Sequence, residues 1–180
     1  MTTTTTGPRE ETSDLLLGVD HPPVGDLLAR FELQSMPGYL LRRVDSRAAA
    51  LFEAHTGQAR LTPRQFGLLK VVHTEGTILQ SELAVRLHLD RSTLGEMLQR
   101  MVDRGLVSRT AAPADRRTSE VRLTSTGQEA LEQNVAGALE AQRALLAPLP
   151  DYLRPVFLAC LEMLADADHP DQPSPDGEEE

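Results

Sequence analysis

The stretch that decides the fold runs from Ser81 to Gly127 and reads SELAVRLHLDRSTLGEMLQRMVDRGLVSRTAAPADRRTSEVRLTSTG. It begins with a short helical pattern, whose residues expected to be buried are Leu83, Ala84 and Leu87. Asp90 is placed to cap a second helix and Gly105 to end it. The second helix carries one apolar stripe, formed by Leu94, Met97, Leu98, Met101 and Val102. Two short helices separated by about three residues predict a helix-turn-helix.

A hairpin pattern follows the second helix. The runs LVSRT and SEVRL read as two short strands, and the segment AAPADRR between them has the proline and aspartate of a turn. Leu106, Val121 and Leu123 are expected to face one way, which leaves Arg109 and Arg122 at more exposed positions. A hairpin directly after a helix-turn-helix is a wing.

The segment before this stretch supplies another helix of the same unit. In LTPRQFGLLKVVHTEG, Thr62 and Gln65 have the spacing of a capping box, Pro63 suits the first helical position, and Gly76 suits the end. The inward face of this helix is expected to hold Phe66, Leu69, Val71 and Val72. The winged helix-turn-helix is therefore predicted to span about residues 61–125.

Three further helical patterns flank the winged unit, at about residues 37–56, 125–147 and 151–165. Thr124 is placed to cap the second of them. One side of that helix is expected to carry Leu131, Val135, Ala138, Leu139 and Leu145. The flanking helices hold more apolar surface than the winged unit needs, and such surplus usually contacts a second copy across a two-fold axis. The predicted fold class is mainly α with a small β-hairpin wing: a winged helix-turn-helix flanked by N- and C-terminal dimerisation helices.

Composition separates a domain of residues 31–166 from two tails. Residues 1–30 are predicted to be a flexible N-terminal extension, and residues 167–180 a disordered acidic tail. The formal net charge is -9, yet residues 61–125 hold ten basic and seven acidic residues. A locally basic segment in an acidic chain is typical of a phosphate-binding face, and an ordinary solvated surface is the alternative.

Several classes of protein are excluded by what the sequence lacks. With Cys160 as its one cysteine, the chain can form no internal disulfide. The five histidines show no metal-ligand spacing, and no nucleophile elbow, phosphate loop or pair of acids indicates an enzyme. We therefore expect no catalytic residues, no metal and no cofactor. No run approaches the roughly 20 apolar residues that cross a bilayer, and no secretory signal is evident, so we expect a cytoplasmic protein without a membrane partner.

The winged segment resembles the MarR family of transcriptional regulators. The motifs that carry the resemblance are QSELA, LDRSTL, DRGLVSR, ADRRTSEVRLT and the TG that opens the next helix, and together they cover about half of the chain. PGYLLRR is also similar to the first dimerisation helix of one branch of the family. The resemblance implies a homodimer that binds a palindromic operator in double-stranded DNA, with the helix after Asp90 in the major groove and each wing near a minor groove. It also implies release by a small, often aromatic or phenolic, ligand, and in a subset a response to oxidants through cysteine.

The tip of the wing holds three charged residues, Asp115, Arg116 and Arg117. Arginine at such a tip can contact phosphates or enter a narrow minor groove. The resemblance makes Arg117 the inserted residue, with Asp115 orienting it and Arg116 as a phosphate contact or second inserted residue. The alternative is a hairpin tip that its charges keep soluble.

The helix after Asp90 leaves a polar face outside its apolar stripe, made of Arg91, Ser92, Gly95, Glu96 and Gln99, with Thr93 at the edge. Such residues suit phosphate anchoring and base reading, and a solvated helix face is the alternative. Many family members have a hydroxyl residue and an arginine where this chain has Gly95 and Glu96. Glu96 can accept a hydrogen bond from cytosine N4 or pair with Arg100. The short helix that begins near Ser81 often starts with a hydroxyl cap in the family. This chain has Leu79 at that position, so Gln80 or Ser81 is expected to cap the helix instead.

Further candidate residues lie outside this helix. Phosphate contacts, or plain surface charges, are expected at Arg64, Arg86 and Arg109. By resemblance, an effector pocket between the dimer helices and the winged unit would use Tyr39, Arg43 and His55 for an aromatic carboxylate, with core packing as the alternative. Cys160 lies in an apolar pattern and is expected to be a small buried hydrophobe rather than a redox sensor.

The favoured function is a homodimeric, sequence-specific regulator of transcription, acting as a repressor that a small-molecule effector releases. There are two alternatives. One is a winged-helix module that binds another protein instead of DNA, which Glu96 and the net negative charge favour, and the other is a cysteine-based redox-sensing regulator.

Overall fold

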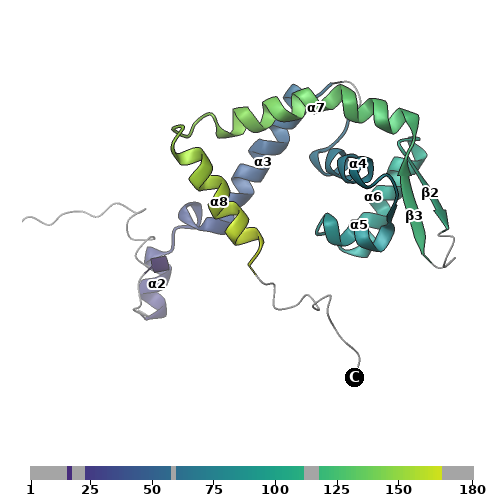
Figure 1. Cartoon of the computed structure of the whole chain (residues 1–180). Coiled ribbons are helices and arrows are strands. Elements are labelled where there is room, and N and C mark those ends of the chain that lie inside the picture. The colour runs from purple at the N-terminus through teal and green to yellow at the C-terminus, as the bar shows by residue number, and fades with distance from the viewer. Residues whose placement is uncertain (1–15, 18–22, 58–59, 112–117, 168–180) are drawn as a thin grey trace, which may run out of the picture.

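The computed structural model describes residues 16–17, 23–57, 60–111 and 118–167. Its elements, in chain order, are α2 (Val24–Arg30), the short 3-10 helix η1 (Leu33–Ser35), α3 (Pro37–His55), α4 (Pro63–Glu75), β1 (Ile78–Leu79), α5 (Gln80–Arg86), α6 (Arg91–Asp103), β2 (Val107–Ala111), β3 (Ser119–Leu123), α7 (Ser125–Leu146) and α8 (Leu153–Ala165). Figure 1 shows α4, α5, α6 and the strands gathered at one end of the long helix α7, with α3 and α8 towards its other end. This is the predicted winged helix-turn-helix with flanking helices.

The sheet has three strands in the order β1-β3-β2, all antiparallel, rather than the two of the predicted hairpin. In β1, Ile78 pairs with Val121 of β3, and Arg109 of β2 lies opposite Val121 on the other side. Directly opposed residues share a face of the sheet, so this row of three lies on one face. Because α5 follows β1 directly, the pairing of β1 with β3 fixes the start of α5 next to the wing.

The core lies between the three helices of the winged unit, the sheet and the first half of α7. The predicted stripe of α6 is confirmed, because Leu94, Leu98 and Met101 are fully buried. In α4 the buried residues are Leu68, Leu69 and Val72, whereas the predicted Phe66 and Val71 are half-buried. Phe66 packs edge-on against Phe52 of α3, with ring centroids 5.6 Å apart. This aromatic pair joins the winged unit to α3.

Local capping signals were predicted correctly at three of the helices. Thr62 and Gln65 form the capping box of α4, Asp90 accepts from the Thr93 N–H at the start of α6, and Thr124 accepts from the Gly127 N–H at the start of α7. The prediction for α5 is wrong. Its cap position is Leu79, with no side-chain capping bond from Gln80 or Ser81. A residue without a hydroxyl cannot satisfy the first N–H groups, and the pairing of β1 with β3 holds this end of the helix instead.

Helix α7 crosses the C-terminal end of α3 at close range. A Cβ atom on Gly137 would lie 2.0 Å from the His55 carbonyl oxygen, so only glycine fits this crossing. One turn away, the buried Asn134 side chain accepts from the Gly57 N–H at 2.9 Å and donates to the Ala130 carbonyl at 2.7 Å. These contacts fix the connection between α3 and the winged unit.

The predicted apolar side of α7 is only partly buried. Leu131 and Ala138 are buried, but Val135 and Leu139 are 44% and 55% exposed. The prediction placed these residues on one side of the helix, and helical spacing agrees with it, but the described residues of one chain cover only part of that side. Helical spacing places Val135 and Leu139 one turn apart, on a strip that the described residues leave largely exposed.

Helix α8 has no buried residue. Val156, Met163 and Leu164 are more than half exposed, and Cys160 is exposed as well. The prediction of a buried Cys160 is therefore wrong in the single chain, because α8 presents its apolar side to solvent instead of to a core. Residues 24–30, which the sequence assigned to the N-terminal extension, form the exposed helix α2. Within the described ranges, no helix is long and apolar enough to cross a membrane.

Candidate nucleic-acid interface

The start of α6 is organised around Asp90. The Ser92 hydroxyl donates to one carboxylate oxygen at 2.5 Å, the Thr93 hydroxyl donates to the other at 2.6 Å, and the Thr93 N–H adds a third bond at 2.9 Å. These donors, the Ser92 hydroxyl first, hold the pKa of Asp90 well below its ordinary value. The hydroxyl protons of both residues are thus committed to Asp90, which leaves their oxygen lone pairs to accept from a ligand.

The middle of α6 presents the other predicted reading residues. Glu96 is exposed and lies 3.9 Å from the Arg100 guanidinium, and Gln99 donates to Asp103 at 2.8 Å. Gly95 is half-buried, and a Cβ atom on it would meet nothing within 4 Å. The structure therefore brings the predicted set together on one side of the helix, opposite the buried stripe.

One further predicted residue, Arg109, lies at the described base of the wing. Arg109 is exposed and shares a sheet face with Val121, and Ala111 lies opposite Ser119 at the last described pair of the hairpin. The tip residues Asp115, Arg116 and Arg117 lie outside the described residues, so their predicted contacts stay a prediction.

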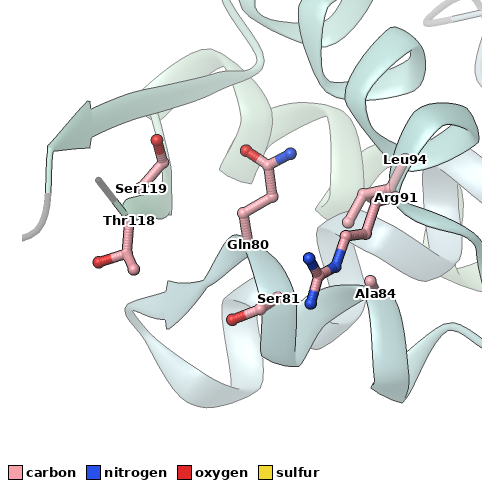
Figure 2. A pocket seen from close by; sticks show the side chains of 7 residues that line it. All are labelled: Gln80, Ser81, Ala84, Arg91, Leu94, Thr118 and Ser119. Carbon is pink, nitrogen blue, oxygen red and sulfur yellow. The ribbon is translucent and has the colours of Figure 1, made fainter. Parts of the chain in front are cut away.

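A pocket of about 380 Å³ lies where α5, α6 and β3 meet. It is lined by Gln80, Ser81, Ala84, Arg91, Leu94, Thr118 and Ser119. Figure 2 shows the Arg91 side chain beside Ser81 and Ala84, with Ser119 and Thr118 approaching from the strand side and Gln80 between them. A guanidinium, an amide and hydroxyls around one hollow are suitable donors for an anionic oxygen.

Of the lining residues only Arg91 was predicted as functional, and Thr118 and Ser119 were not considered for such a role. Their signal in the sequence is weak, because a hydroxyl residue at the start of a strand is ordinary. Only the pairing of β3 between β1 and β2 brings them opposite the start of α6.

The remaining predicted phosphate contacts differ in their surroundings. Arg64 lies exposed in the first turn of α4. Arg86, at the end of α5, pairs with Glu75 at 2.9 Å and with Glu82 at 3.4 Å. Two carboxylates offset its charge, so Arg86 is a weaker candidate for a phosphate contact than Arg64.

The predicted effector residues are spread along α3. Tyr39 and Arg43 lie one turn apart in its first half, Tyr39 half-buried and Arg43 exposed. His55 is the last residue of the helix, about 18 Å further along its axis, and its Nδ1 contacts the Leu51 carbonyl at 2.8 Å. A single chain therefore does not bring His55 together with the other two. Nor do the described residues contain a group of three or more His, Cys, Asp or Glu side chains placed to hold a metal ion.

Comparison with known proteins supplies the family. The model of the MarR family matches residues 61–119, which include α4 to the start of β3. A protein of Thauera aromatica described as a transcriptional regulatory protein for the hcr operon is 30% identical over 146 residues, covering 79% of this chain and 88% of that protein. The chain belongs to the MarR family.

Solved structures extend this MarR-family likeness beyond the winged unit. Bordetella bronchiseptica BpsR, whose DNA binding is regulated by 6-hydroxynicotinic acid, matches with a TM-score of 0.71 and 27% identity over 77% of this chain and 99% of that one. A variant of E. coli MarR in complex with operator DNA matches with a TM-score of 0.66 and 26% identity over 71% and 91%. The MarR-family chain described here is therefore a winged-helix transcriptional regulator, and the surface around α6 is its candidate DNA interface.

Proposed function

We propose that this MarR-family regulator acts as a homodimer on a palindromic operator, represses transcription there, and is released by a small aromatic ligand. Its site of action is then the cytoplasm, where the DNA lies. The observation that carries the proposal is the surface of α6: a buried apolar stripe on one side and Arg91, Glu96 and Gln99 exposed on the other, beside the hairpin that leads to Arg116 and Arg117.

The DNA contacts follow from this geometry. The exposed face of α6 enters the major groove, where its N-terminal residues reach base edges. Arg91, Ser81 and Ser119 surround the pocket beside it and supply donors for a backbone phosphate. Arg64 and Arg109 add positive charge from α4 and β2, and the wing tip reaches the adjacent minor groove.

The dimer follows from the apolar surface that a single chain leaves exposed. Leu40 and Leu41 of α3, Leu139 of α7, and Val156 and Leu164 of α8 are all at least 43% exposed. An apolar face of this kind on three helices is typical of an interface with a second copy. Two copies related by a two-fold axis place two α6 helices about one helical turn of DNA apart, roughly 34–36 Å.

The ligand site is proposed at the same interface. Tyr39 and Arg43 offer a ring and a guanidinium one turn apart, which suits an aromatic carboxylate. We propose that His55 joins them only from elsewhere in the dimer, because one α3 holds it too far away. With 6-hydroxynicotinic acid as the probe, release of DNA should need more ligand in Arg43→Ala than in the neighbouring control Arg42→Ala. Equal responses of the two variants contradict this site.

Fluorescence polarisation with the duplex upstream of the gene tests DNA binding. We expect binding at sub-micromolar protein that weakens steeply with salt. The slope of log affinity against log salt concentration should be about −0.9 for each phosphate contacted. Light scattering on the same sample should give a dimer of the 19.7 kDa chain. A folded protein without salt-sensitive binding supports the alternative, a winged-helix module that binds another protein.

A further inference from the structure

Glu96 is an acidic residue on the surface that the proposed function turns towards DNA. Its side chain is 74% exposed, and its ion-pair partner Arg100 is 63% exposed at 3.9 Å, beyond hydrogen-bond distance. A pair so exposed contributes little to the stability of the helix. Phosphates repel a carboxylate, so on electrostatics alone Glu96 weakens DNA binding. Its presence on the reading face therefore needs another explanation.

The neighbours of Glu96 on α6 are already occupied. Ser92 and Thr93 donate their hydroxyl protons to Asp90, and the Gln99 amide donates to Asp103. Glu96 makes only the loose contact with Arg100 among the described residues. In the middle of the exposed face, its carboxylate is thus the group that is freest to bind a base.

Gly95 gives a base edge access to this carboxylate. It lies inside α6, where glycine costs about 1 kcal/mol relative to alanine. Packing among the described residues does not require it, because a Cβ atom there would meet none of them within 4 Å. The absence of a side chain beside Glu96 allows the floor of a groove to approach the helix backbone closely.

The chemistry of the major groove then selects one base. An ionised carboxylate only accepts hydrogen bonds. Guanine presents two acceptors there and thymine one, and the adenine amine lies beside the N7 acceptor, which repels a carboxylate. Cytosine presents its N4 amine with a single flanking acceptor, the O6 of its paired guanine, whereas the adenine amine lies between its own N7 and the O4 of the paired thymine. A carboxylate on the reading face therefore favours cytosine over the other three bases.

We propose that Glu96 is a specificity-determining residue that selects cytosine at one base-pair position of each operator half-site, with Gly95 leaving room for the contact. This inference rests on the proposed DNA-binding function. The ion pair with Arg100 partly offsets the repulsion between the carboxylate and the phosphates.

Selection from a pool of duplexes with randomised sequence, followed by polarisation measurements on single-base variants, tests the proposal. The wild-type protein should require cytosine at one half-site position, and other bases there should weaken binding about 5- to 150-fold, the range for one good base contact. Glu96→Gln should prefer adenine at that position alone, because glutamine offers both a donor and an acceptor. Glu96→Ala should lose the discrimination without gaining adenine.

Two matched controls separate base reading from general effects. Glu129→Gln removes the same charge from an exposed position on α7 and should leave the selected sequence unchanged. Gly95→Ala should weaken binding to the selected site, whereas Gly67→Ala, another helical glycine with open space around its Cβ position, should not.

The possible results are distinguishable. If the wild type binds DNA with a sequence preference that Glu96→Gln leaves unchanged, the inference is overturned and the proposed function stands. A uniform loss of affinity for all sequences in Glu96→Gln also overturns the inference, because it assigns Glu96 a structural effect only. If the wild type shows no salt-sensitive DNA binding, both the inference and the proposed function are wrong.

Discussion

Replacing Asn134 by alanine should destabilise the protein more than any change at the neighbouring exposed positions of α7. Asn134 is fully buried, and its side-chain Oδ1 accepts a hydrogen bond of 2.9 Å from the N–H of Gly57, which lies in the segment after α3. The same amide donates to the Ala130 carbonyl one turn earlier in α7. The variant removes the hydrogen bond that connects α7 to this segment.

The magnitude follows from two terms. An N–H left without its partner in a buried place costs about 1–3 kcal/mol, and the lower half applies here because Gly57 is only partly covered. Removing the amide group opens a cavity of roughly 40 Å³, which adds about 1 kcal/mol at ~24 cal/mol per Å³. Together, Asn134→Ala should lower the free energy of unfolding by about 2–3 kcal/mol, or the melting temperature by roughly 4–12 °C.

Urea unfolding followed by circular dichroism measures this loss, at one protein concentration for all variants because dimerisation shifts apparent stability. Gln133→Ala is the matched control: Gln133 is the exposed neighbour on the same helix and should change stability by less than about 0.5 kcal/mol. A loss in Asn134→Ala no larger than that of the control refutes the assigned role of the buried amide.

Three further predictions concern other parts of the chain. Gly137→Ala should lower the free energy of unfolding by about 1–3 kcal/mol or more, because its Cβ atom would lie 2.0 Å from the His55 carbonyl oxygen. The control Gly67→Ala should be neutral or stabilising. Similar losses in both variants would contradict the close crossing of α7 and α3. Because the pKa of Asp90 is lowered in the folded state, the ionised carboxylate stabilises the protein above the ordinary carboxyl range, and this effect is lost as the pH falls below about 4. The difference in unfolding free energy between the wild type and Asp90→Ala should therefore shrink at low pH. A difference that stays constant with pH would contradict this role of Asp90. Met163→Glu places a charge on the exposed apolar side of α8, where burial in a dimer interface would leave it unpaired. The chain should stay folded, but the mass measured by light scattering should fall to that of the 19.7 kDa monomer. An intact dimer would exclude this face from the interface.

The sequence predicted best what is decided locally. Thr62, Asp90 and Thr124 cap helices because a side-chain oxygen reaches an N–H three residues later, whatever the rest of the chain does. Gly76 and Gly105 follow their helices at positive φ for the same local reason. The apolar stripe of α6 was equally readable, because helical spacing alone defines which residues lie together.

Features that depend on distant partners were missed or misjudged. The strand β1 is two residues long and exists because β3 pairs with it, so no pattern of its own predicts it. Cys160 lies in an apolar run, but its burial depends on what covers α8, and the described part of the chain leaves it exposed. Within the candidate interface, the exposed face of α6 was predicted from spacing. The position of Ser119 in the same pocket as Arg91, in contrast, depends on the register of the sheet.

The most direct test of the DNA-binding account replaces both wing-tip arginines. Polarisation should show that Arg116→Ala/Arg117→Ala binds the wild-type operator at least tenfold more weakly, with a shallower salt dependence, because arginines of a wing tip contact phosphates or enter the minor groove. Arg143→Ala, at the end of α7 remote from the winged unit, should bind as the wild type does. Unchanged affinity in a folded, dimeric double variant would contradict the central claim that this surface binds DNA.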